Sequence, residues 1–172
     1  RAGAGYDTID ISAASNRGIF VANCPGKNSI AVAELAWGHI LGCDRRLADQ
    51  AADLKGGRWK KKTYSKARGL HGRTLGILGY GRIGREVASR GKAFGMTVAA
   101  WSRSLSQEQA EAEGVTWCGS PLDLASRADV VSVHVASTPE TRGMVDAAFL
   151  KALGNQGILV NTSRGDIIDE AA

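Results

Sequence analysis

Three glycines in the segment TLGILGYGRIGREVASR, residues 74–90, have the spacing of a turn that binds phosphate. Gly79, Gly81 and Gly84 follow an apolar run and precede a run with helical periodicity. In a dinucleotide-binding turn the first glycine permits the bend, the second lets a pyrophosphate approach the main chain, and the third lets the helix pack on the strand. The free N–H groups and the dipole of the first helical turn then attract the phosphates. A plain glycine-rich turn is the alternative, and the strand and helix expected on either side favour dinucleotide binding.

Two polar residues follow the next apolar run, MTVAAW (96–101). A site for NAD usually has an acidic residue here, which accepts hydrogen bonds from the ribose 2′-hydroxyl. This chain has Ser102 and Arg103 instead. A hydroxyl and a guanidinium suit a 2′-phosphate, so the pair favours NADP over NAD as the cofactor. The alternative is a solvated Arg103 and less selective binding of NAD.

The elements that must position these residues alternate along the chain between strands and helices. Each predicted strand is almost continuously apolar, which is typical of a parallel sheet covered by helices on both faces. We therefore predict an α/β, doubly wound, Rossmann-like fold, with residues 74–172 as its core inside a single domain spanning 1–172. The strands are expected at 74–78, 96–101, 115–117, 129–134 and 157–162, and the helices at 82–94, 106–113, 121–127 and 146–153.

Before this core the sequence predicts three further features. GIFVAN (18–23) has the pattern of a short strand, ended by a Pro-Gly turn, and residues 29–54 have the apolar spacing of one long helix. The connection GGRWKKKTYSKARG (56–69) is basic and contains aromatic residues, which could indicate nucleic-acid binding. Because the cluster is local, we expect a solvated connection with Trp59 packed down, and no nucleic acid as a partner.

Composition limits the class of protein. The chain has 172 residues, 44% hydrophobic and 23% charged, with a net charge of +5, as in a globular domain. No apolar run is long enough for a membrane span and no signal-peptide pattern opens the chain, so we expect a cytoplasmic protein without membrane contact.

The three cysteines are scattered along the chain, and neither end has the pattern of a natural terminus. Cys24, Cys43 and Cys118 form no CxxC pair, so we expect free buried thiols and no metal site. The chain starts at Arg1 without a methionine, and DEAA (169–172) has the pattern of a first helical turn. We therefore expect a piece of a longer polypeptide.

Further segments carry a resemblance to a known family. RAGAGYDTID (1–10), GIFVANCPGKNSIAVAE (18–34), DVVSVHVASTPETRGMVD (129–146) and ILVNTSRGDIIDEAA (158–172), together with the glycine turn, resemble the D-isomer-specific 2-hydroxyacid dehydrogenases. That family includes D-3-phosphoglycerate, glyoxylate and hydroxypyruvate reductases. The resemblance implies an NAD(P)-binding domain cut at both ends relative to the full enzyme. It also implies hydride transfer between NAD(P)H and a small 2-keto or D-2-hydroxy acid.

The resemblance also implies site residues. Arg164 matches the catalytic arginine that binds the substrate carboxylate. A guanidinium suits carboxylate binding because it can donate paired hydrogen bonds to a carboxylate. Arg164 is also expected to belong to the cofactor site. The remaining matches are the main chain of Ala2, Gly3 and Ala4 for the substrate carboxylate, Arg82 and Ile83 at the pyrophosphate, Val135 and Pro139 in a loop along the cofactor, and Thr162 and Ser163 beside the nicotinamide.

In the family the proton-donating histidine and its glutamate lie in a later block, after residue 172. We therefore do not assign His134 as a proton donor, and we expect this chain alone to be inactive. The family further implies a homodimer through the 29–54 helix. A second functional class stays open, a nucleotide-sensing corepressor of the same fold that binds partner peptides, and a third is a module that only dimerises.

Overall fold

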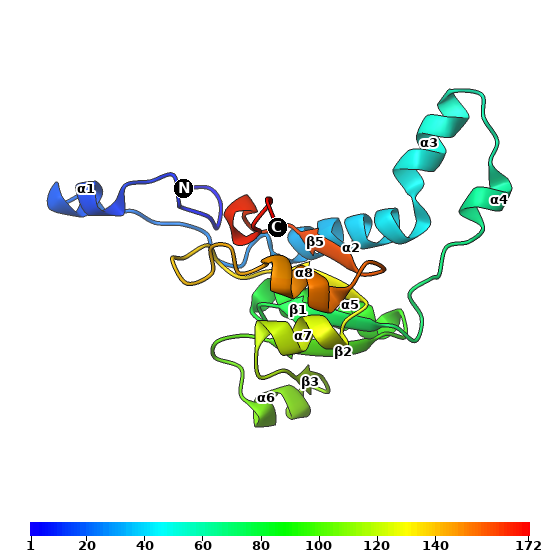
Figure 1. Cartoon of the computed structure of the whole chain (residues 1–172). Helices are drawn as coiled ribbons and strands as arrows, with labels where there is room; N and C mark the ends of the chain where they lie inside the picture. Colours follow the sequence, from blue (N-terminus) through cyan, green and yellow to red (C-terminus); the bar gives the residue numbers. More distant parts are fainter.

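The core of the molecule is one parallel sheet of five strands. The computed structural model describes residues 1–172, and its strand order is β3-β2-β1-β4-β5 with every neighbouring pair parallel (Figure 1). The predicted doubly wound α/β fold is therefore confirmed. The strands are β1 (Thr74–Leu78), β2 (Thr97–Trp101), β3 (Thr116–Trp117), β4 (Val130–Val133) and β5 (Ile158–Asn161).

Helices cover both faces of this sheet because the strands are apolar on both sides. One face packs against α2 (Ser29–Arg45) and α5 (Arg82–Ala93), where the indole nitrogen of Trp37 donates to the carbonyl of Val87 over 3.1 Å. The other face packs against α7 and α8 through Leu124 and Phe149, both fully buried. The helices that follow the strands are α5 (Arg82–Ala93), α6 (Gln107–Ala112), α7 (Pro121–Arg127), α8 (Ala147–Leu153) and the 3₁₀ turn η1 (Gly165–Ile167), each within a residue or two of the expected bounds where one was predicted.

The single helix predicted over residues 29–54 is wrong. The chain forms α2 (Ser29–Arg45) and α3 (Leu47–Lys55), separated by Arg46 in the left-handed region with φ of 54°. A left-handed residue other than glycine costs about 1 kcal/mol, and contacts offset this cost. The Arg46 guanidinium pairs with Asp49 at 2.8 Å and lies 5.1 Å from the centre of the Tyr64 ring.

Residues 47–64, from α3 to Tyr64, form an arm, in which the segment after α3 folds back around the buried carboxylate of Asp53. Asp53 accepts hydrogen bonds from the Tyr64 hydroxyl at 2.6 Å, from Arg58 at 2.8 Å and from Lys60 at 3.2 Å. The Tyr64 hydroxyl and then the two cations hold the pKa of Asp53 well below its usual range. Tyr64 ends a short helix, α4 (Lys61–Tyr64), that was not predicted. Trp59 is 79% exposed, so the expectation that it packs down is wrong.

The first 24 residues extend from the opposite side of the sheet domain (Figure 1). They contain the unpredicted helix α1 (Ile11–Asn16), and residues 18–23 form no strand. This segment meets the first residues of the chain through isolated hydrogen bonds and not through a ladder, among them the bonds from the Arg1 amino group to Ala22 O at 3.0 Å and from Cys24 N to Gly3 O at 3.0 Å. Without a neighbouring ladder, the β-forming pattern of these residues does not produce a strand.

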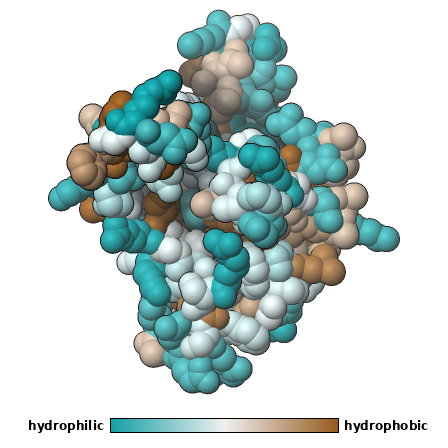
Figure 2. All heavy atoms as spheres, turned by 90° about the vertical axis from the view of Figure 1, so that its left-hand side faces the viewer, coloured by the Kyte–Doolittle hydropathy of each residue, from teal (hydrophilic) through white to brown (hydrophobic).

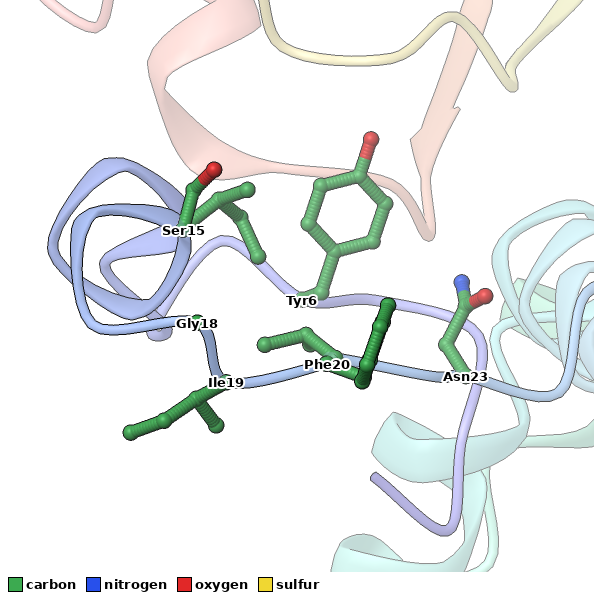
Figure 3. Close-up of a pocket in the computed structure, with 8 residues that line it drawn as sticks. Tyr6, Ser15, Gly18, Ile19, Phe20 and Asn23 are labelled. Atoms are coloured by element: carbon green, nitrogen blue, oxygen red, sulfur yellow. The ribbon is translucent and has the colours of Figure 1, made fainter.

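An apolar cavity of about 510 Å³ lies between residues 6–15 and residues 18–23 of this segment (Figure 3). Its lining leaves apolar side chains open to solvent, with Phe20 completely exposed. Figure 2 views the molecule from this end and shows brown hydrophobic residues between teal hydrophilic ones.

The cysteines and the C-terminal residues differ in part from what the sequence predicts. The cysteines are free, but only Cys118 is buried, because Cys24 and Cys43 lie on exposed surfaces. Residues 169–172 form a turn stabilised by the Asp169 side chain and not a helical turn. None of the helices has the length and hydropathy needed to cross a membrane.

Candidate cofactor-binding site

The glycine turn lies at the carboxyl end of β1, where the strand order reverses between β1 and β4. Gly79 has φ of +105°, and a Cβ on it would lie 2.6 Å from the Val135 nitrogen. A Cβ on Gly84 would overlap the Gly79 carbonyl and lie 2.9 Å from the Ile77 side chain. Both glycines are therefore required for the turn and for the approach of α5 to the sheet. At Gly81, by contrast, an added Cβ would meet nothing within 4 Å. This open space above the main chain is what a bound pyrophosphate requires.

Among the four α-helices that follow β1, only α5 begins without a hydrogen bond to an N-cap side chain. The α6, α7 and α8 helices each begin with a Ser or Asp side chain that accepts a backbone N–H of the first turn. The N-cap of α5 is Gly81, which has no side chain to do this, and its first turn contains no acidic residue. Its first N–H groups are therefore available to an outside acceptor, and the helix dipole favours an anion there.

Arg82 adds a positive charge at this helix start. Its guanidinium lies against Gly26 of the Pro-Gly turn before α2, so closely that a Cβ on Gly26 would be 2.6 Å from Nη1. Gly26 also has φ of +79°, a conformation that other residues rarely adopt. Ile83, the next residue, is half-buried and packs against the hydrophobic core.

A cavity of about 150 Å³ continues from the glycine turn across the ends of β2 and β4. It brings together five of the residues predicted to bind the cofactor: Gly79, Gly81, Ser102, Arg103 and Val135. No carboxylate lines it. Four other residues line the cavity and were not predicted as cofactor-binding, namely Trp101, His134, Ala136 and Thr141; of these, only His134 was considered, and it was not assigned as a proton donor. Position alone could have found the first three, because each lies at or just after the end of a strand that reaches this edge of the sheet. Pro139 is exposed on the same loop but does not line the cavity.

His134 is a neutral group in the wall of this cavity. Burial lowers its pKa to about 4, and its Nε2 lies 2.8 Å from the Ser132 hydroxyl. The ring is therefore in its neutral form near pH 7 and lacks the imidazolium proton that a general acid donates.

The end of β5 holds the next set of predicted residues beside the β4 loop. The Ser163 hydroxyl donates to the Val135 carbonyl, and the Ser163 N–H donates to Asn161 Oδ1 at 2.9 Å. Asn161 in turn donates from Nδ2 to the Arg164 carbonyl at 2.7 Å, which fixes the turn. The Thr162 Oγ1 is buried and has no hydrogen-bond partner. A buried hydroxyl without a partner costs free energy, so it marks a place where a ligand can supply one.

Arg164 extends from this turn towards the beginning of the chain. Its Nε donates to Asp7 Oδ2 at 2.8 Å. The predicted substrate loop, Ala2 to Ala4, belongs to the same N-terminal segment. The Gly3 N–H already donates to the Arg1 carbonyl at 2.9 Å, which leaves the N–H groups of Ala2 and Ala4 for a ligand.

Comparison with known proteins decides the family. Residues 37–172 match the family model described as "D-isomer specific 2-hydroxyacid dehydrogenase, NAD binding domain". The chain belongs to this family. It comprises the family's NAD-binding domain, and the uncapped helix start and open glycine turn fit a nicotinamide dinucleotide.

Relatives in the family carry the names of dehydrogenases and reductases. The chain is 41% identical over 172 residues to D-3-phosphoglycerate dehydrogenase of Methanocaldococcus jannaschii, covering all of this chain and 33% of the relative. It is 41% identical over 173 residues to hydroxypyruvate reductase of Thermotoga maritima, covering all of this chain and 55% of the relative. It is 40% identical to glyoxylate reductase of Thermococcus litoralis, covering 98% of this chain and 52% of that one. The chain thus spans a third to a half of their length.

Solved structures show the same fold. A formate dehydrogenase of Granulicella superposes with a TM-score of 0.90 at 31% identity, covering 98% of this chain and 46% of that one. The apo D-lactate dehydrogenase of Escherichia coli gives a TM-score of 0.87 at 30% identity, covering 99% and 53%. These named enzymes do not favour the corepressor alternative.

Proposed function

We propose that this chain binds a nicotinamide dinucleotide at residues 79–84 as part of an enzyme that interconverts a small 2-keto acid and a D-2-hydroxy acid. The observation that carries the proposal is the uncapped start of α5 beside the open space at Gly81. Both are suited to a pyrophosphate, and both lie at the carboxyl edge of the sheet, where open α/β sheets bind ligands.

The residues of the chain bind and orient, whereas the hydride is supplied or accepted by the nicotinamide ring when the cofactor is bound. Arg164 would hold the carboxylate of the acid, since a guanidinium donates paired hydrogen bonds to a planar carboxylate. Thr162 and Ser163, on the same turn, would lie beside the nicotinamide. The proton at the C2 oxygen would come from a histidine outside these 172 residues.

Binding is tested by titrating the chain with NADH or NADPH and following tryptophan fluorescence. Trp101 lines the cavity and is therefore an internal reporter. Quenching that saturates supports the proposal, and its absence at millimolar cofactor would overturn it. Because the proton donor lies elsewhere, we expect the chain alone to reduce neither glyoxylate nor hydroxypyruvate. Measurable turnover would show that this part of the proposal is wrong.

We further propose that the cofactor is NADP in preference to NAD. Ser102 and Arg103 line the cavity, and no carboxylate lines it that could repel a 2′-phosphate; Arg103 is exposed and forms no ion pair within 4 Å, although Glu140 is close enough for the Arg103 charge to lower its pKa. Arg103→Ala should weaken NADPH binding about tenfold and leave NADH binding nearly unchanged, because only NADPH carries the phosphate. Arg17→Ala removes one exposed positive charge near α1 and is the matched control. An equal effect of Arg103→Ala on both cofactors, or on neither, would refute the preference.

The chain is also proposed to form a homodimer through α2 and the arm. Large apolar side chains are exposed along them, on α2 at Ile30 and Leu35, on α3 at Leu47 and Leu54, and at Trp59. Contiguous apolar surface marks protein–protein interfaces, and we propose that these side chains form one.

Light scattering tests the dimer through a pair of aromatic substitutions. The wild type should have twice the monomer mass, and Trp59→Ala should shift the mass towards the monomer, since exposed tryptophans are common interface anchors. Phe20→Ala is the control, because Phe20 is even more exposed but lies at the other end of the molecule. A monomeric wild type would exclude the proposed dimer.

A further inference from the structure

The guanidinium of Arg164 is held in place by residues from the beginning of the chain. Its Nε donates to Asp7 Oδ2 at 2.8 Å, and its Nη2 donates to the same oxygen. Its Nη1 donates to the Ser163 carbonyl at 3.1 Å. Three hydrogen bonds from one side chain therefore fix the plane and the direction of this group.

A glycine lets the N-terminal loop approach the arginine so closely. A Cβ on Gly5 would lie 2.6 Å from Nη2 of Arg164. The loop is itself anchored, because Cys24 N donates to the Gly3 carbonyl at 3.0 Å and Asn23 Nδ2 donates to the Ala4 carbonyl at 2.8 Å. Asp7 is thus presented to Arg164 by a tethered loop.

The contacts leave the arginine able to bind a second carboxylate. A guanidinium has five N–H donors. Asp7 takes the edge formed by Nε and Nη2, and Ser163 takes one donor of Nη1, so one N–H remains on each of Nη1 and Nη2. A pair of donors on adjacent nitrogens is the arrangement that grips a carboxylate through two hydrogen bonds.

We propose that Asp7 is a positioning residue that holds Arg164 with this free pair directed at the carboxylate of the 2-keto acid. The proposal rests on the proposed function, because it requires Arg164 to be the carboxylate receptor. The side chains of Asp7 and Arg164 are 63% and 43% exposed, so their ion pair contributes little to folding. The ion pair instead orients the Arg164 guanidinium. A change in folding stability alone would not reproduce the loss of this orientation.

The test uses the 172-residue chain saturated with NADH or NADPH, whichever binds more tightly, and oxamate as an unreactive planar mimic of a 2-keto acid. Arg164 Nε–H is followed by ¹H–¹⁵N NMR in the wild type, Asp7→Asn and Asp7→Glu. Glu170→Gln removes an exposed charge without a hydrogen-bond partner near the same turn and is the matched control. We expect Asp7→Asn to shift the Nε–H resonance and to weaken oxamate binding about tenfold, with cofactor affinity unchanged. Asp7→Glu should restore part of the affinity, and Glu170→Gln should match the wild type.

The outcomes separate this inference from the proposed function. If the wild type binds no cofactor, the proposed function fails. If the cofactor binds but oxamate leaves Arg164 Nε–H unchanged, Arg164 is not the carboxylate receptor, and that part of the proposed function fails together with the inference. If oxamate shifts Arg164 Nε–H but Asp7→Asn binds oxamate like the wild type, only the role of Asp7 fails. Tighter oxamate binding by Asp7→Asn would also overturn it, since Asp7 would then compete with the ligand for the arginine.

Discussion

Replacing Gly81 by alanine separates the binding role of the glycine turn from its folding role. An added methyl group at Gly81 meets no atom of the protein within 4 Å, and the residue has a negative φ of −90° with ψ of −156°, at the margin of the extended region that alanine adopts. It would occupy the space that we assign to the pyrophosphate. We therefore expect a folded protein that has lost cofactor affinity.

The expected magnitudes follow from these surroundings. Alanine is a poorer N-cap than glycine by about 0.5–1 kcal/mol, and about 0.4–1 kcal/mol is regained because alanine has less freedom in the unfolded chain. The free energy of unfolding should thus change by less than about 1 kcal/mol. Pushing a pyrophosphate off the main chain should weaken binding at least about tenfold, equivalent to ~1.4 kcal/mol. Gly79→Ala is the contrasting variant, since positive φ and the 2.6 Å approach to Val135 N should destabilise the fold by about 2–5 kcal/mol.

The assay pairs urea unfolding with fluorescence titration by NADH and NADPH. Gly38→Ala, on α2, is a control glycine that also has nothing within 4 Å of an added Cβ. It should bind the cofactor like the wild type. Wild-type affinity in Gly81→Ala would refute the assignment of this space to the pyrophosphate. Unfolding of Gly81→Ala would refute the claim that the space has no structural use.

Three further predictions concern stability and reactivity. Asp44→Ala should cost about 3–5 kcal/mol in urea unfolding, because Asp44 and Arg73 are both buried and pair at 3.1 Å; a loss below 1 kcal/mol would contradict a tight pair. The pKa of His134 is lowered to about 4 from 6.5, so the unfolded chain binds the extra proton first as pH falls below about 6.5. Stability should then decrease by up to about 3 kcal/mol between pH 6.5 and 4, and His134→Gln should flatten this part of the urea-derived pH profile. Burial raises the pKa of Cys118 to about 11, so a thiol reagent at pH 8 should modify the other two cysteines in the native protein and Cys118 only after unfolding; modification of all three at one rate would contradict its burial.

The sequence was most informative where structure is decided locally. The glycine turn and the alternation of apolar strands with helices depend on neighbours in the chain, and they were predicted with nearly correct bounds. Ser106 and Asp146, taken as first helical residues, proved to be N-caps, a shift of one residue. The break at Arg46 has no glycine or proline to announce it, because its contacts with Asp49 and Tyr64 appear only after the arm has folded back.

Long-range partners account for the other differences. Residues 18–23 have the composition of a strand, but a strand also needs a neighbour, and sequence periodicity does not report whether one is present. The contact between Arg164 and Asp7 joins residues 157 apart. The resemblance to the family pointed to the arginine but not to the residue that holds it, since nothing in the local pattern around Asp7 indicates a partner at the other end of the chain.

The two edges of the sheet differ in what faces their unpaired polar groups, and this difference indicates which edge binds. At the amino edge, the buried Arg73 guanidinium donates to Asp44 at 3.1 Å. Two buried atoms there make no hydrogen bond, Asp44 Oδ2 and Arg73 Nε, but each faces an opposite charge of the protein, on Arg45 at 3.2 Å and on Asp129 at 3.7 Å. At the carboxyl edge, the first N–H groups of α5 have no side-chain cap and the Thr162 hydroxyl is buried without a partner. Leaving such groups unpaired costs free energy, and a ligand that supplies the missing partners recovers it, so the carboxyl edge is the one suited to binding.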